Sequence, residues 1–170
     1  MPTKLSIIVF VASPLDYARY RHTALFIEFD EEIHKENFIT SDSAGTGTNA
    51  SLAIDEESTH VKTSVMEVVG SPGFFTFSER LNWGIPTSTN IARVIPVATI
   101  DSSGLEMRDI ISKTQIANGE VETDWNSQNW VGDVLDRLVS AGLLDVEKKE
   151  RGVDDMIEAV LEAADENYVG

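Results

Sequence analysis

A serine and a histidine are placed where they could share a proton in acyl chemistry. Ser127 lies in the polar run 124–130, directly before an apolar helical pattern, and His22 opens a β-rich segment beside Arg21. A nucleophile at a helix start lies near the positive end of the helix dipole, and an imidazole can act as its general base. Both residues also have ordinary interpretations, because serine is a common helix N-cap and histidines at strand ends are often structural.

The segment that carries Ser127 is predicted to form an amphipathic helix. Apolar residues recur at helical spacing and make one face, namely Val131, Val134, Leu135, Leu138 and Val139. Asn126 or Ser127 suits the N-cap, and Gly142 suits the end of the helix. We therefore expect a helix over about 126–141 with position 127 in its first turn.

The rest of the chain predicts strands first and helices afterwards. Strand patterns cover about 5–12, 22–29, 64–69, 74–77 and 92–100, and Pro96 puts the last strand at an edge or a bulge. The polar segment 30–63 is predicted to be a long mobile excursion with room for a short hairpin. Further helices are predicted from Ser102 or Ser103 to near Gly119, and over 153–167. This order indicates an α+β domain with an antiparallel sheet packed against helices.

The composition predicts one soluble domain over residues 1–170, with a core at about 4–144 and an acidic C-terminal helix. A chain of 170 residues with 42% hydrophobic content can bury a sizeable core. The net charge of −16 argues against nucleic acid and anionic membranes as partners. No run of 18 apolar residues predicts a membrane span, and no signal peptide is recognisable, so we expect a cytoplasmic protein.

Disulfides and thiolate metal sites are excluded because the chain has no cysteine. The three histidines, His22, His34 and His60, are not at ligand spacing. We therefore expect no structural metal.

Three stretches together resemble the circularly permuted papain-like superfamily, which includes NlpC-type proteins. They are 21–28 (RHTALFIE), 68–75 (VVGSPGFF) and 125–131 (WNSQNWV). The superfamily includes relatives of lecithin:retinol acyltransferase, PPPDE-type deconjugating peptidases and many small fungal proteins, and its histidine precedes its cysteine along the chain. The resemblance covers about 6–144 and implies a permuted papain-like fold.

Residue by residue, the resemblance places Ser127 at the catalytic cysteine, His22 at the catalytic histidine and Trp130 at an aromatic position. Glu67 is the candidate for the group that orients the imidazole, since a carboxylate within an apolar strand needs a partner. His60 is the alternative third residue, although its neighbours indicate a loop. We expect the Ser127 oxygen to lie within about 4 Å of a ring nitrogen of His22.

Other side chains near these motifs are candidates for substrate binding. Asn126 and Gln128 could donate an amide hydrogen bond to an oxyanion, although capping and turn formation explain them as well. The aromatic candidates for a cleft are Trp83, Trp130, Phe74, Phe75 and Phe77. For the phenylalanines, packing in the core is the stronger interpretation.

The resemblance implies a thiol hydrolase or acyltransferase that acts on an amide, ester or thioester of a small molecule or peptide, without a cofactor. A cysteine at position 127 would attack, and His22 would take its proton. Ser127 departs from this pattern, and three explanations stay open: an engineered Cys-to-Ser change, a natural pseudoenzyme, and a genuine serine nucleophile. The alternative function is an inactive binding module of the same fold.

Overall fold

A computed structural model describes residues 2–13, 15–39, 51–53, 60–83, 85, 90–118 and 124–163. The strands in these ranges form one six-stranded sheet with the order β3-β5-β4-β2-β1-β6. Neighbouring strands are antiparallel except for β3 and β5, which are parallel. The strands are β1 (Pro2–Phe10), β2 (Thr23–His34), β3 (Ser51–Ala53), β4 (His60–Val69), β5 (Thr76–Leu81) and β6 (Ile91–Asp101).

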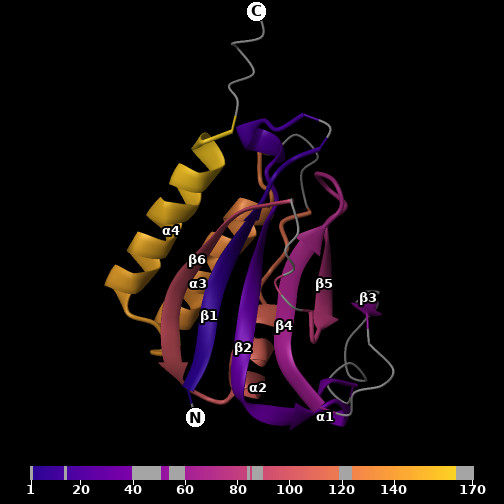
Figure 1. Cartoon of the computed structure of the whole chain (residues 1–170), viewed down its shortest axis with the longest axis vertical. Coiled ribbons are helices and arrows are strands. Elements are labelled where there is room, and N and C mark those ends of the chain that lie inside the picture. The colour runs from indigo at the N-terminus through magenta and orange to yellow at the C-terminus, as the bar shows by residue number, and fades with distance from the viewer. Residues whose placement is uncertain are drawn as a thin grey trace, which may run out of the picture.

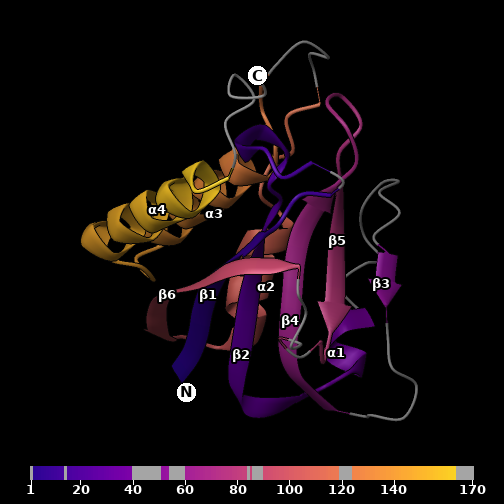
Figure 2. The same cartoon turned by 45° about the horizontal axis from the view of Figure 1, so that its top comes forward.

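The longer helices pack on one side of this sheet, which confirms the predicted α+β class. In Figure 1, α3 and α2 lie behind the strands, and α4 runs along the side of β6. Figure 2 shows α3 and α4 side by side. The helical elements are η1 (Ala18–Tyr20), α1 (Glu36–Ile39), α2 (Gly104–Ser112), α3 (Ser127–Ser140) and α4 (Val146–Leu161).

Alternate side chains of the central strands are buried on opposite faces of the sheet. Ile7 pairs with Leu25 and belongs to the main core between the sheet and the helices. Ile8 pairs with Ala24 and belongs to a smaller cluster with Phe26. Since both faces are covered here, the middle of each strand, residues 7–10 and 24–27, is a continuous apolar run rather than an alternation with polar residues.

The prediction of a polar excursion over 30–63 is wrong at both of its boundaries. β2 continues to His34 and β4 already begins at His60, and the two strands pair again there after an irregularity. The short helix α1 follows β2, and its Phe38 is fully buried, with its ring centroid 6.0 Å from that of Phe29. The prediction of a mobile segment over 40–50 and 54–59 lies outside the described residues.

The helix predicted over 126–141 is confirmed, and the other two differ in length. In α2, the Ser103 hydroxyl accepts from the Glu106 N–H as an N-cap, but the helix ends at Ser112 rather than near Gly119. The helix α4 begins at Val146 rather than at 153. The prediction missed its first two turns because they are mostly charged and show no apolar pattern. The predicted end of that helix at 167 lies outside the described residues.

Three other strand predictions are close to the structure, and the strand expected at 5–12 is β1, which ends at Phe10. β6 is an edge strand, and Pro96 pairs with Ser6 at a register shift, as predicted from the proline. The strand expected at 74–77 is β5, which begins at Thr76, and Phe74 is left exposed in the preceding turn.

Candidate functional site

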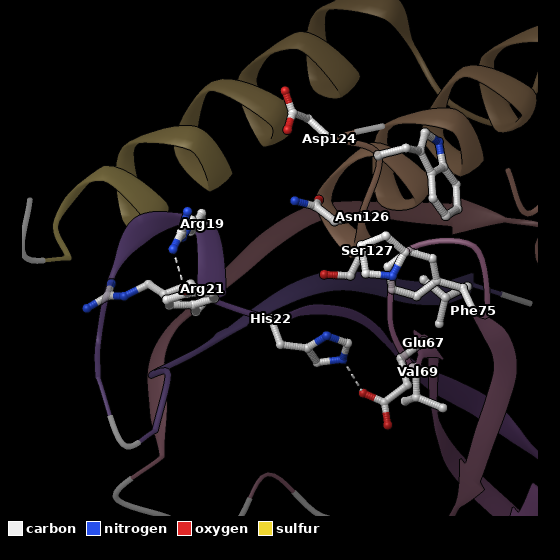
Figure 3. A pocket seen from close by; sticks show the side chains of 14 residues that line it. Arg19, Arg21, His22, Glu67, Val69, Phe75, Asp124, Asn126 and Ser127 are labelled. Carbon is white, nitrogen blue, oxygen red and sulfur yellow. Dashed lines mark hydrogen bonds and ion pairs between the residues drawn. The ribbon is translucent and has the colours of Figure 1, made fainter. Parts of the chain in front are cut away.

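A pocket of about 830 Å³ opens where β2 begins and β4 ends, beside the first turn of α3. Five of the residues named as candidates from the sequence line it: His22, Glu67, Phe75, Asn126 and Ser127 (Figure 3). The rest of its apolar wall comes from residues that were not candidates, among them Tyr20, Val68, Val69, Pro72 and Trp125. The fold therefore brings the histidine, the carboxylate and the helix start into one cavity.

The imidazole of His22 is held by Glu67. The Nε2 atom of His22 lies 2.6 Å from the Oε2 atom of Glu67, and Arg80 Nη2 lies 3.2 Å from the other oxygen. Burial raises the pKa of Glu67, but the hydrogen bond from His22 and the charges of His22 and Arg80 lower it by a larger amount. The net shift of the Glu67 pKa is therefore downward. Because an ionised carboxylate can only accept, Nε2 must carry a hydrogen, so Nδ1 is the ring nitrogen that can exchange a proton with another group.

The hydroxyl of Ser127 is held by a different strand. Its oxygen accepts a hydrogen bond from the backbone N–H of Thr23 at 3.1 Å and lies 3.3 Å from the Thr23 hydroxyl. Ser127 is 5% exposed and is the first residue of α3. Among the described residues, no hydrogen bond joins Ser127 to His22, so the expected pair shares a pocket without direct hydrogen bonding.

The amide side chains at the helix start cap and tether α3. The Asn126 side chain accepts from the backbone N–H of Gln128 at 2.9 Å, and Asn129 accepts from the N–H of Asn126 in return. This capping box satisfies free N–H groups of the first turn. The Gln128 amide donates to the carbonyls of Ala18 and Arg21 at 3.4 and 3.2 Å. Gln128 therefore ties α3 to the segment before His22, and the oxyanion role predicted for it is not supported.

Two tryptophans predicted to bind substrate lie outside the pocket. Trp130 is fully buried in the core, with its ring 6.1 Å from that of Phe77. Trp83 packs 6.4 Å from the Phe10 ring and beneath the guanidinium of Arg80. The pocket is walled instead by Trp125, which precedes the N-cap and has no periodic pattern to mark it.

The other aromatic and histidine candidates divide in the same way. Phe75 lines the pocket, whereas Phe77 packs against the core and Phe74 is 72% exposed. His60 lies at the opposite end of β4, where its ring centroid is 4.6 Å from that of His34. His60 is therefore not the third member of the site, and Glu67 is the residue that contacts His22.

One buried residue of the site was missed as a functional candidate. Arg21 makes two hydrogen bonds to Asp16, at 2.8 and 2.6 Å, and one to the carbonyl of Ala159 at 2.5 Å. The hydrogen bond from Arg21 lowers the pKa of Asp16. Because Arg21 directly precedes His22, these bonds fix the backbone that presents the imidazole. The only signal in the sequence is that the two residues are adjacent.

Within the described ranges, none of the helices is both long enough and apolar enough to cross a membrane. In the same residues, no three histidine, aspartate or glutamate side chains are grouped so that they could hold a metal ion.

Comparison with known proteins gives a family for this fold and site. No curated protein and no solved structure matches the chain. The model of a family of unknown function, DUF6540, matches residues 9–145. This match includes His22, Glu67 and Ser127 and covers most of the chain. The chain therefore belongs to DUF6540, a family of unknown function.

Proposed function

We propose that the pocket is a papain-like acyl-chemistry site that, with serine at position 127, binds its ligand without turning it over. The observation that carries this proposal is the pairing of His22 with Glu67 in the same pocket as the first residue of α3. The ligand class is a small molecule or peptide with an amide, ester or thioester group.

The parts of the site suit acyl chemistry at position 127. Glu67 fixes the His22 ring through Nε2, which leaves Nδ1 to accept a proton from a nucleophile. The start of α3 provides the positive end of a helix dipole for a negative sulfur or oxygen. Apolar side chains share the walls with polar and charged ones, so a ligand with an apolar chain and a polar carbonyl group fits the lining.

The serine itself is poorly placed for attack. A serine nucleophile needs a base within hydrogen-bonding reach, but among the described residues the Ser127 hydroxyl is hydrogen-bonded to Thr23 and not to His22. A thiol ionises far more readily than a hydroxyl near neutral pH, so a cysteine at the same position could react where serine does not. This contrast favours binding without turnover in the present chain.

The test uses the single thiol that Ser127→Cys introduces into a chain without cysteine. We expect this thiol to react with iodoacetamide with a pKa below the ordinary value of about 8.5, because the helix start and a protonated His22 both favour the thiolate. Adding His22→Ala should remove most of the effect. Ser140→Cys is the matched control, because residue 140 is exposed at the opposite, negative end of α3.

Two results would contradict the proposal. A Ser127→Cys thiol that titrates near about 8.5 with or without His22 would leave Ser127 as part of a helix start and the protein as a binding module without an acyl site. Labelling of Ser127 in the unmodified chain by a fluorophosphonate, if His22→Ala abolished it, would show a reactive serine and refute binding without turnover.

A further inference from the structure

Two histidines, His34 and His60, lie side by side on neighbouring strands, at the opposite end of β4 from Glu67. His34 is the last residue of β2 and His60 the first of β4, and the antiparallel register places them directly opposite each other. Their ring centroids are 4.6 Å apart, and the ring planes are inclined at 49°. In Figure 1 this end of the sheet lies beside α1. Strand pairing therefore joins two metal-ligating side chains that are far apart in the sequence.

The separation of the two rings suits one shared metal ion. An imidazole nitrogen binds a transition metal at about 2.0–2.1 Å, which puts the ring centroid about 3 Å from the ion. Two centroids 4.6 Å apart can therefore share one ion with their nitrogens near a right angle. Neighbouring ligands at a right angle match the square-planar or tetragonal sites of Cu²⁺ and Ni²⁺, whereas tetrahedral Zn²⁺ needs a wider angle.

The surroundings of the pair allow a cation to approach. His34 is exposed and His60 is half-buried, so solvent reaches this part of the sheet. The chain has a net charge of −16, and a negative surface raises the local concentration of cations. Lys62 is on the same face of β4 as His60, but it is exposed, and its long flexible stem lets the ammonium lie in water away from the ion.

We propose that His34 and His60 form a two-histidine chelate for Cu²⁺ or a similar divalent transition-metal ion, with water in the remaining coordination positions. Imidazole is a ligand that these ions favour, and Cu²⁺ binds nitrogen sites more tightly than Ni²⁺ or Zn²⁺. The ion bridges β2 and β4 where their pairing resumes after the irregularity between Glu28 and Ile33. This site is independent of the acyl site proposed above, because neither histidine lines the pocket.

Calorimetric titration of the untagged chain with Cu²⁺ tests the proposal. We expect one tightly bound ion per chain. In NMR spectra with less than one equivalent of Cu²⁺, the ring signals of His34 and His60 should broaden before that of His22, because the ion is paramagnetic. With only three histidines, these signals can be assigned by single substitutions.

The variants His34→Phe and His60→Phe separate coordination from ring packing. Each keeps an aromatic ring in the pair but removes a nitrogen ligand. Each should weaken Cu²⁺ binding about tenfold or more, because a single imidazole no longer chelates. The double variant should bind little more weakly than either single variant, since the chelate is already lost. His34→Gln and His60→Gln should give the same loss, which keeps the test valid if an exposed phenylalanine causes aggregation.

His22→Gln is the matched control. The third histidine lies in the pocket and contacts Glu67, so its replacement should leave the affinity for Cu²⁺ unchanged. Mg²⁺ should not compete with Cu²⁺, because Mg²⁺ prefers oxygen ligands.

Three results would overturn the proposal. The first is the absence of a tight Cu²⁺ site in the unmodified chain. The second is an affinity that stays the same in His34→Phe and His60→Phe, because the ion would then bind elsewhere. The third is an equal loss in His22→Gln. The acyl site is tested separately, by the thiol at position 127, so either proposal can fail without the other.

Discussion

Replacing Arg108 by methionine should strongly destabilise the fold, because it strands a buried carboxylate. Glu79 and Arg108 are 1% and 7% exposed in their side chains. The Nε and Nη2 atoms of Arg108 donate to Glu79 over 2.7 to 3.0 Å. Among the described residues, the hydroxyl of Ser64 also donates to that carboxylate, at 2.9 Å. In Arg108→Met, Glu79 keeps this one neutral partner.

The expected cost is about 3 to 5 kcal/mol in the free energy of unfolding, the range for breaking a buried ion pair on one side. For a chain of this size that corresponds to a fall in Tm of about 6 to 20 °C. The double change Glu79→Leu with Arg108→Met removes both charges. It should recover most of the loss, because the desolvation penalty disappears with the pair.

Urea denaturation followed by tryptophan fluorescence measures these differences. Lys113→Met is the matched control, since Lys113 pairs with Asp109 at the end of α2 but is 67% exposed. Its cost should stay below about 1 kcal/mol. If Arg108→Met cost no more than Lys113→Met, burial of the pair would not govern its contribution, and the reasoning would fail.

Two further predictions concern packing and pH. Gly104→Ala should destabilise the fold by about 1 to 3 kcal/mol, because an added Cβ would lie 2.1 Å from a ring carbon of Phe29. A Cβ added at Gly132 would meet no surrounding atom within 4 Å. Gly132→Ala should therefore stabilise α3 by about 0.5 to 1 kcal/mol. Thermal melts of both variants check this, and equal shifts would contradict it. For Glu67, the lowered pKa means that its ionised form stabilises the fold above its unfolded value near 4.5, and the contribution is lost as pH falls through the lower folded value. The difference in unfolding free energy between the wild type and Glu67→Gln should therefore shrink in urea melts taken at successively lower pH below about 5, and a constant difference would count against the assignment.

Local sequence patterns were sufficient to predict the helix start and the imidazole partner. Asn126 was predictable as an N-cap because capping depends on a few neighbouring residues, and it does cap α3. Glu67 was predictable because an acidic residue inside an apolar strand needs a partner, and that partner is His22. The α+β class followed from the order of strand and helix patterns.

The remaining parts of the site depend on strand register, which a single sequence does not reveal. Arg80 reaches Glu67 only because β5 pairs with β4 so that Arg80 lies opposite Val65 and Glu67 opposite Ser78. For a similar reason, substrate binding was predicted for Trp130, whereas Trp125 was given no role. Both flank the helix start, and only the packing of α3 against the sheet decides which is buried and which faces the pocket.

The pairing of β1 has a practical consequence for fragments of this protein. The family match begins at residue 9, yet β1 begins at Pro2 and is hydrogen-bonded along both of its edges, to β2 and to β6. The match ends at residue 145, before α4, whose Ala159 carbonyl is bound by Arg21 beside the imidazole. A fragment cut to residues 9–145 would lack most of β1, which would leave unpaired edges on β2 and β6. It would also lack the Ala159 carbonyl that Arg21, the residue before His22, binds. Expression of this fold therefore calls for boundaries set by the sheet, from at least Pro2 through Leu161.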